Sequence, residues 1–198
     1  MKMIGFSFDL HPLLFTIVFV ILCGITYFVL KRKKMNMSPK QLFFVGATIF
    51  YSLSVVKLTL LPITISFDKA SYPDVPWKYY YQLIPFKTII SALNQGNILQ
   101  VIGNFVLLLP LPILIGLLKN NSTTFIRALI MVISISLGIE LIQLITNFLT
   151  GIPNKVADID DLILNSIGGF VGWILLKLYF AFIGEKNKSL NTQSSVNN

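Results

Sequence analysis

The stretch Ala157-Asp158-Ile159-Asp160-Asp161-Leu162 lies between two long apolar segments, in a chain that has only 8 acidic residues. Three carboxylates within four positions repel one another unless water, a cation or a basic group compensates them. At the mouth of a membrane helix, such a cluster needs a specific physical explanation. Glu140, inside the preceding apolar segment, needs one for the same reason.

Composition identifies the chain as a polytopic membrane protein. Hydrophobic residues make up 55% and charged residues 12% of the 198 residues, and the mean hydropathy is +0.76, whereas a typical soluble domain is about 25% charged. We expect an all-α transmembrane helical bundle that forms one domain over residues 1–183, with a polar, disordered tail over residues 184–198. The net charge is +8. Because the basic residues flank apolar segments, this charge indicates membrane topology and anionic lipid headgroups, and not nucleic acid.

Two scarce residue types exclude several kinds of site. The chain has one cysteine, Cys23, and one histidine, His11, so an intrachain disulfide is excluded and a Cys/His zinc site lacks ligands. A Ser-His-Asp triad could use only His11, at the extreme N-terminal edge. Cys23 lies inside an apolar segment, where packing explains it. Any chemistry must therefore use Asp, Glu, Asn, Gln, Lys, Arg or Tyr side chains.

Five apolar segments are long enough to span a membrane, since a spanning helix needs about 20 apolar residues. They are approximately Pro12–Leu30, Gln41–Leu61, Ile98–Leu118, Phe125–Leu149 and Leu162–Ile183. In the first segment the charges follow the apolar run, so we interpret it as a retained helix and not as a signal peptide. Pro110 and Pro112 are expected to kink the third.

The long connection Ile63–Asn97 is rich in aromatic and aliphatic side chains. Trp77 and the tyrosines that follow it are typical of a membrane–water interface. Pro85 interrupts any continuous helix here. We therefore expect an interfacial or re-entrant element and not a sixth span.

The run Lys31-Arg32-Lys33-Lys34 is the strongest topological signal in the chain. The positive-inside rule assigns it to the cytoplasm. The N-terminus is then extracytoplasmic and the C-terminus cytoplasmic.

Glu140 is the most costly residue of the fourth span. It shares one helical face with Gln143 and Asn147, at i, i+3 and i+7. An ionised carboxylate at such a depth costs about 2.5–3.5 kcal/mol on the insertion scale, so Glu140 must be protonated, paired or hydrated. Two interpretations stay open: Glu140 belongs to a functional site, or it is a structural hydrogen-bonding group that ties spans together.

The aspartate cluster also allows two interpretations. Asp158 or Asp160 could cap the fifth span, which accounts for one aspartate and not for three. A divalent cation could use Asp158, Asp160 and Asp161, although no cofactor is required and the spacing is not that of an EF-hand. Glu140 lies about 14 Å below the outer end of its span, too deep to join the aspartates unless the helices shift. Gly168 and Gly172 form a G-x-x-x-G step, which favours close helix packing.

Depth along the helices places the polar groups in one leaflet, and we expect them to line a pocket that opens to the extracytoplasmic side. The predicted lining is Asn104, Glu140, Gln143, Asp158, Asp160, Asp161 and Asn165. Lys57 and Lys155 are expected to balance its charge.

The chain resembles the VanZ-like family of bacterial membrane proteins over residues 41–177. The segments that carry the resemblance are Thr59-Leu60-Leu61-Pro62, Leu83-Ile84-Pro85-Phe86-Lys87-Thr88-Ile89, Gly103-Asn104-Phe105-Val106-Leu107-Leu108-Leu109-Pro110-Leu111, Ile139-Glu140-Leu141-Ile142-Gln143-Leu144 and Asp158-Ile159-Asp160-Asp161-Leu162-Ile163-Leu164-Asn165-Ser166-Ile167-Gly168-Gly169. The family usually has an arginine three residues before the first aspartate. Lys155 stands there in this chain, which keeps the charge but loses the planar two-pronged donor.

The resemblance implies an integral protein of the bacterial cell membrane that contributes to low-level resistance to the glycopeptide antibiotic teicoplanin. We expect it to bind an amphipathic drug or a cell-wall lipid precursor in the outward pocket. Two alternatives stay open. One is an intramembrane acid–base or metal-assisted enzyme that acts on a lipid-linked substrate of the cell envelope. The other is a proton-coupled transporter in which Glu140 carries the proton.

Overall fold

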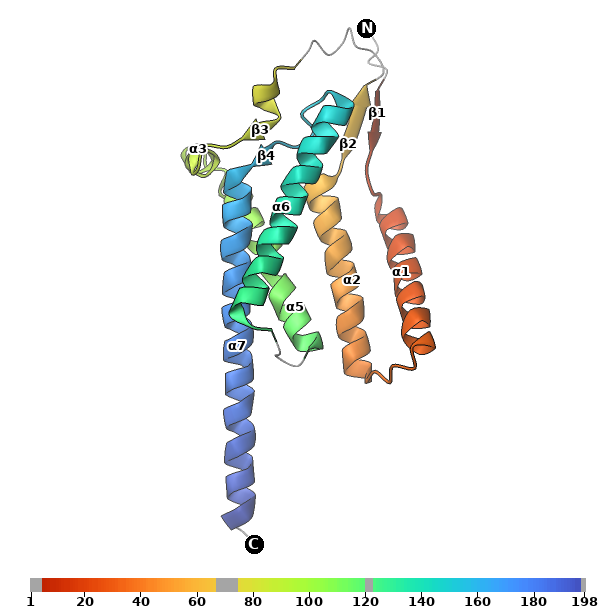
Figure 1. The fold of residues 1–198 in the computed structure, drawn as a ribbon, viewed down its shortest axis with the longest axis vertical. Helices are drawn as coiled ribbons and strands as arrows, with labels where there is room; N and C mark the ends of the chain where they lie inside the picture. Colours follow the sequence, from red (N-terminus) through yellow and green to blue (C-terminus); the bar gives the residue numbers. More distant parts are fainter. Residues whose placement is uncertain (1–4, 67–74, 120–122, 197–198) are drawn as a thin grey trace.

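A computed structural model covers the chain and describes residues 5–66, 75–119 and 123–196, with side chains as far as Gly184 (Figure 1). Its elements in chain order are β1 (Gly5–Phe8), α1 (Pro12–Arg32), α2 (Pro39–Leu60), β2 (Ile63–Ser66), η1 (Trp77–Tyr79), β3 (Tyr81–Gln82), α3 (Lys87–Asn94), α4 (Ile98–Leu107), α5 (Pro110–Leu118), α6 (Phe125–Thr150), β4 (Ala157–Asp158) and α7 (Ile159–Val196). Within the described residues, 5 helical stretches are long and apolar enough to cross a membrane. The predicted all-α transmembrane bundle is confirmed.

The third span is broken into α4 and α5. Pro110 occupies the first position of α5, where its missing N–H costs nothing. The break frees the carbonyl oxygen of Leu107, because Leu111 donates to Leu108 instead. The hydroxyl of Tyr51 on α2 donates to that oxygen at 2.8 Å. A side chain of a neighbouring span thus satisfies a backbone group that lipid could not.

Helix α7 packs against α6, α4 and α5. Gly168 and Gly172 make this packing possible. A Cβ atom on Gly168 would overlap the carbonyl oxygen of Phe105 in α4, and one on Gly172 would overlap that of Leu109. The predicted close-packing role of the G-x-x-x-G step is confirmed.

Helix α1 lies at the edge of the molecule and packs against α2 (Figure 1). None of its residues is buried. Antiparallel pairing of β1 with β2 joins the beginning of the described chain to the end of α2. The spans α2, α4, α5, α6 and α7 form the bundle that positions the polar side chains.

Helix α3 lies across the direction of the spans at the end of the bundle that carries β1 and β2 (Figure 1). It is only 8 residues long, too short to cross a membrane. Ile90 and Leu93 on α3 are exposed, as are Leu83 and Ile84 just before it. The connection thus holds a short helix with exposed apolar side chains and not a sixth span, and its position at the membrane interface stays a prediction.

Helix α7 continues to Val196, well beyond the membrane-length stretch that ends at Gly184. The helix thus extends into the segment that was expected to form the polar tail, as far as Val196. No proline interrupts this part of the sequence, so a helix that starts in the membrane can continue.

Candidate ligand site

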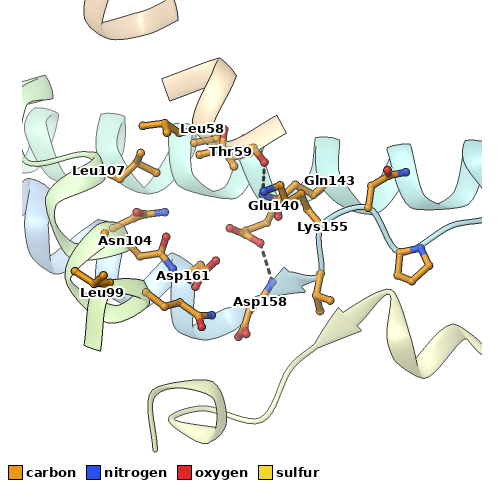
Figure 2. Close-up of a pocket in the computed structure, with 17 residues that line it drawn as sticks. Leu58, Thr59, Leu99, Asn104, Leu107, Glu140, Gln143, Lys155, Asp158 and Asp161 are labelled. Carbon is orange, nitrogen blue, oxygen red and sulfur yellow. Dashed lines mark hydrogen bonds between the residues drawn. The ribbon is translucent and has the colours of Figure 1, made fainter. Parts of the chain in front are cut away.

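A cavity of about 500 Å³ lies among α2, α4, α6, α7 and the connection between α6 and α7 (Figure 2). Its wall on α2 is formed by Leu58 and Thr59, at the opposite end of that helix from the basic run Lys31–Lys34. The polar side chains in the wall are those of Thr59, Gln100, Asn104, Glu140, Gln143, Asn154, Lys155, Asp158, Asp161 and Asn165. The cavity is therefore polar although membrane-spanning helices enclose it.

The structure brings most of the predicted site residues together. The predicted residues found in the wall are Asn104, Glu140, Gln143, Lys155, Asp158, Asp161 and Asn165. Asp160 and Lys57 do not line the cavity. Lys57 is half-buried on α2, next to Leu58 and Thr59, which do line it.

Asp160 is fully buried and caps a helix to which it does not belong. Its carboxylate accepts backbone N–H groups from the start of α3: Phe86 at 2.5 Å, Thr88 at 2.8 Å and Ile89 at 3.1 Å. The first turn of a helix leaves such donors without partners, and a carboxylate satisfies them well. Asp160 therefore anchors the interfacial helix to α7 and has no oxygen directed at the cavity.

Asp158 caps its own helix. Its Oδ1 accepts the N–H of Asp160 at 2.9 Å, two residues on, as the N-cap of a helix that begins at Ile159. Its Oδ2 accepts the hydroxyl of Thr88 on α3 at 2.5 Å. The predicted capping role is confirmed for Asp158, while Asp160 performs a second capping role that the sequence does not reveal.

Glu140 meets the aspartate segment directly. Its Oε2 accepts the backbone N–H of Asp158 at 2.7 Å (Figure 2). The expectation that Glu140 lies too deep to reach this segment is wrong. It assumed that the cluster stays at the outer mouth of the bundle, whereas the connection after α6 folds back along that helix.

Asn147 holds the returning connection in place. Its Nδ2 donates to the carbonyl oxygen of Lys155 at 2.6 Å, and its Oδ1 accepts the N–H of Asn154 at 2.9 Å. The side chain is fully buried. The third polar residue of the α6 face therefore sets the depth at which β4 and α7 begin.

Asp161 and Asn165 occupy successive turns of α7 on the face that also carries Asp158, as their spacing predicts. Asp161 Oδ1 accepts a hydrogen bond from Nδ2 of Asn104 on α4. Lys155 is the cation of the wall, and its ammonium group forms no ion pair with any carboxylate in the described part of the chain. The acidic groups of the wall are thus hydrogen-bonded and are not paired with Lys155.

The described residues contain no preformed cluster of metal ligands. Within the described residues, no group of three or more His, Cys, Asp or Glu side chains is arranged to hold a metal ion. Asp160 directs both oxygens at the start of α3. Asp158 directs one oxygen at Thr88 of α3 and one at the backbone of Asp160, whereas Asp161 faces Asn104. A divalent cation at the three aspartates stays a prediction.

A second hollow of about 320 Å³ lies on the other side of Glu140, between α6 and α7. Apart from two carboxyl residues, its lining is aliphatic or aromatic: Tyr81, Leu83, Leu137, Leu141, Leu144, Ala157, Ile159 and Leu162. The two carboxyl residues, Glu140 and Asp158, also line the polar cavity. They form a shared wall between a polar space and an apolar groove.

Sequence reasoning missed the partners of the predicted residues. These are the carbonyl of Thr59, the amides of α3, Ser136, and Asn147 as an organiser of the connection. One signal was available: Pro85 followed by a short amphipathic segment predicts a helix start without a capping side chain of its own. The position of that start beside Asp160 was not predictable from spacing.

The sequence model of a family described as VanZ/LLP1 matches residues 44–180. This range is well over half of the chain and contains every residue that lines the polar cavity. No curated protein and no solved structure matches the chain significantly.

Proposed function

We propose, from the premise that the chain belongs to the VanZ-like family, that this membrane protein binds an amphipathic molecule at the extracytoplasmic leaflet. The ligand is a glycopeptide drug of the teicoplanin type or a lipid of cell-wall synthesis. Binding lowers the access of the drug to its target and so contributes to low-level resistance.

The observation that carries the proposal is the shared wall formed by Glu140 and Asp158. A polar cavity lies on one side of these residues and an apolar groove on the other. An amphipathic molecule needs both environments within a short distance, since its polar part must be hydrogen-bonded and its alkyl chain must stay out of water. The polar part would occupy the cavity, and the chain would lie in the groove between α6 and α7.

The position of the cavity supports an outward opening. Leu58 and Thr59, which line it, lie at the far end of the 22-residue helix α2, which begins shortly after the basic run Lys31–Lys34. The positive-inside rule assigns that run to the cytoplasm of a bacterial cell, so the cavity would lie in the opposite leaflet. Glycopeptides and their cell-wall targets are found on that side.

Expression in a susceptible bacterium tests the proposal through the drug concentration that stops growth. Glu140→Gln and Asp161→Asn each remove a charge from the wall and keep the shape of the side chain. We expect both variants to lose most of the protection given by the original chain, because buried charge-assisted hydrogen bonds are the strongest contacts a polar ligand can make.

Asp9→Asn is the matched control, since Asp9 is exposed beside α1 and does not line the cavity. Membrane abundance is measured for every variant. If both cavity variants protect as well as the original chain at equal abundance, the cavity does not perform this function. Turnover of a lipid-linked substrate that depends on Glu140 would instead favour the enzyme.

A further inference from the structure

Gln143 has a buried acceptor that no protein group uses. Its Nε2 donates to the carbonyl oxygen of Thr59 at 2.9 Å. A backbone carbonyl can only accept, so this contact fixes which end of the amide is which. Its Oε1 is buried and receives no hydrogen bond, although the side chain lines the cavity and is only 7% exposed.

Asn165 repeats the arrangement on α7. Its Nδ2 donates to the hydroxyl of Ser136 at 3.0 Å, and its Oδ1 is buried without a donor. The residue is 1% exposed. A hydroxyl can donate or accept, so this contact alone leaves the amide orientation open; the fixed orientation of Gln143 carries the argument. Buried acceptors without donors are rare in native proteins, and each one needs an explanation.

The carboxyl groups of the wall have spare acceptors as well. Glu140 Oε2 and Asp161 Oδ1 each accept one N–H, from Asp158 and from Asn104. The other oxygen of each group receives no hydrogen bond from the described residues. Uncompensated carboxyl groups within membrane spans are costly and usually mark a functional partner. The acceptors of Glu140, Asp161 and Gln143 therefore lack hydrogen-bond donors, and no cation pairs with the two carboxyl groups within the described residues.

We infer that the ligand places a primary ammonium group in the cavity, against Glu140, Asp161 and the amide oxygen of Gln143. This inference rests on the proposed function and names the chemistry of the ligand. An ammonium group has three N–H donors, no acceptor and one positive charge, which suits the unused acceptors of Glu140, Asp161 and Gln143. A phosphate would find mainly acceptors here, and a quaternary ammonium has no N–H to donate. Lys155 in the same wall suits an anionic neighbour of the amine.

A simple amphipathic amine tests the inference on the purified full-length chain in a neutral detergent. The probe is dodecylamine, and its matched controls are dodecyltrimethylammonium, which has the charge without donors, and dodecanol, which lacks the charge. Calorimetry should show dodecylamine binding at least about tenfold more tightly than either control, since a hydrogen bond to a buried charge contributes that much. Equal affinity for all three probes would overturn the inference.

The same titration on variants locates the amine. Glu140→Gln and Asp161→Asn should each weaken dodecylamine binding by about tenfold or more, because each removes one charged acceptor. Asp9→Asn should leave binding unchanged, and a thermal unfolding curve of each variant establishes that it is folded. Unchanged binding by folded cavity variants would contradict the site. Binding of Mg²⁺ without any binding of the amine would overturn the inference and assign the cavity to a divalent cation instead.

Two sources could supply the amine in a cell, a membrane lipid headgroup or an amine-bearing peptide drug. Nanodiscs of phosphatidylethanolamine, compared with nanodiscs of phosphatidylcholine, present the same phosphate with and without N–H donors. If phosphatidylethanolamine displaces dodecylamine and phosphatidylcholine does not, the site is assigned to a lipid. If teicoplanin displaces dodecylamine, the site is assigned to the drug. Loss of resistance in the cavity variants without any amine binding would reject this inference and leave the proposed function standing.

Discussion

Helices α1 and α6 are both apolar and of membrane length, yet one lies at the edge of the molecule and the other in its centre. No residue of α1 is buried. The buried residues of α6 include four polar side chains, Ser136, Glu140, Gln143 and Asn147. The difference shows that an apolar sequence alone does not place a span in the interior of this protein.

The physical reason is the solvent. Lipid tails are as apolar as a leucine side chain, so an apolar surface gains little by leaving them. A polar group in lipid has no partner, and it gains a great deal by meeting another helix. The polar face of α6 therefore turns towards α7 and the cavity, while α1 can stay in contact with lipid on most of its surface.

The largest difference between interior and edge is expected at glycines. Gly168→Ala places a Cβ where the backbone oxygen of Phe105 lies, and it should destabilise the bundle by about 3 kcal/mol or more. Gly24→Ala in α1 meets no atom within 4 Å, and it should be neutral or stabilise by up to about 1 kcal/mol through helix propensity. Unfolding titrations in mild detergent measure both. Equal stability of the two variants would show that α4 and α7 are not closely packed.

An intermediate effect is expected at the acidic residues. Asp160→Ala leaves three backbone N–H groups of α3 without their acceptor and should cost about 2 kcal/mol. Asp9→Ala removes an exposed acid beside α1 and should change stability by less than about 0.5 kcal/mol. Hydrogen exchange should accelerate selectively at the amides of Phe86, Thr88 and Ile89. Protection that persists in Asp160→Ala would mean that α3 is held by other contacts.

The smallest effect is expected for apolar truncations. Val132→Ala in α6 removes methyl groups that pack against Gly169 of α7 and should cost about 1 kcal/mol, mainly through lost packing. Leu22→Ala in α1 removes a side chain that faces lipid and should be nearly neutral. The same unfolding titration compares them. A larger loss for Leu22→Ala would place α1 inside an assembly of this chain with itself or with a partner.

Much of the fold was predictable from the sequence. Hydropathy located the five spans, because the bilayer requires long apolar helices whose backbone groups are satisfied internally. Pro110 predicted the irregularity of the third span, and the structure shows a complete break there. Helical spacing also placed Asp158, Asp161 and Asn165 on one face, and all three line the cavity.

The roles of the individual carboxyl groups were less predictable. Three neighbouring aspartates have three different partners: Asp158 caps α7, Asp160 caps α3, and Asp161 meets Asn104. Spacing along one helix cannot distinguish these roles, because α3 and Asn104 come from distant parts of the chain. The depth of the segment relative to Glu140 likewise depends on the path of the connection that Asn147 holds.

The sequence by itself determined that the chain resides in a membrane, where its spans lie, and which few side chains are too polar for lipid. Each of these properties depends on the transfer of local segments between water and hydrocarbon, which composition and order suffice to describe. The tertiary structure decided which polar groups satisfy one another and which are left for a ligand. Hydrogen bonds act over about 3 Å, so a choice among partners such as Thr59, Asn104 and Ser136 exists only after the helices have packed.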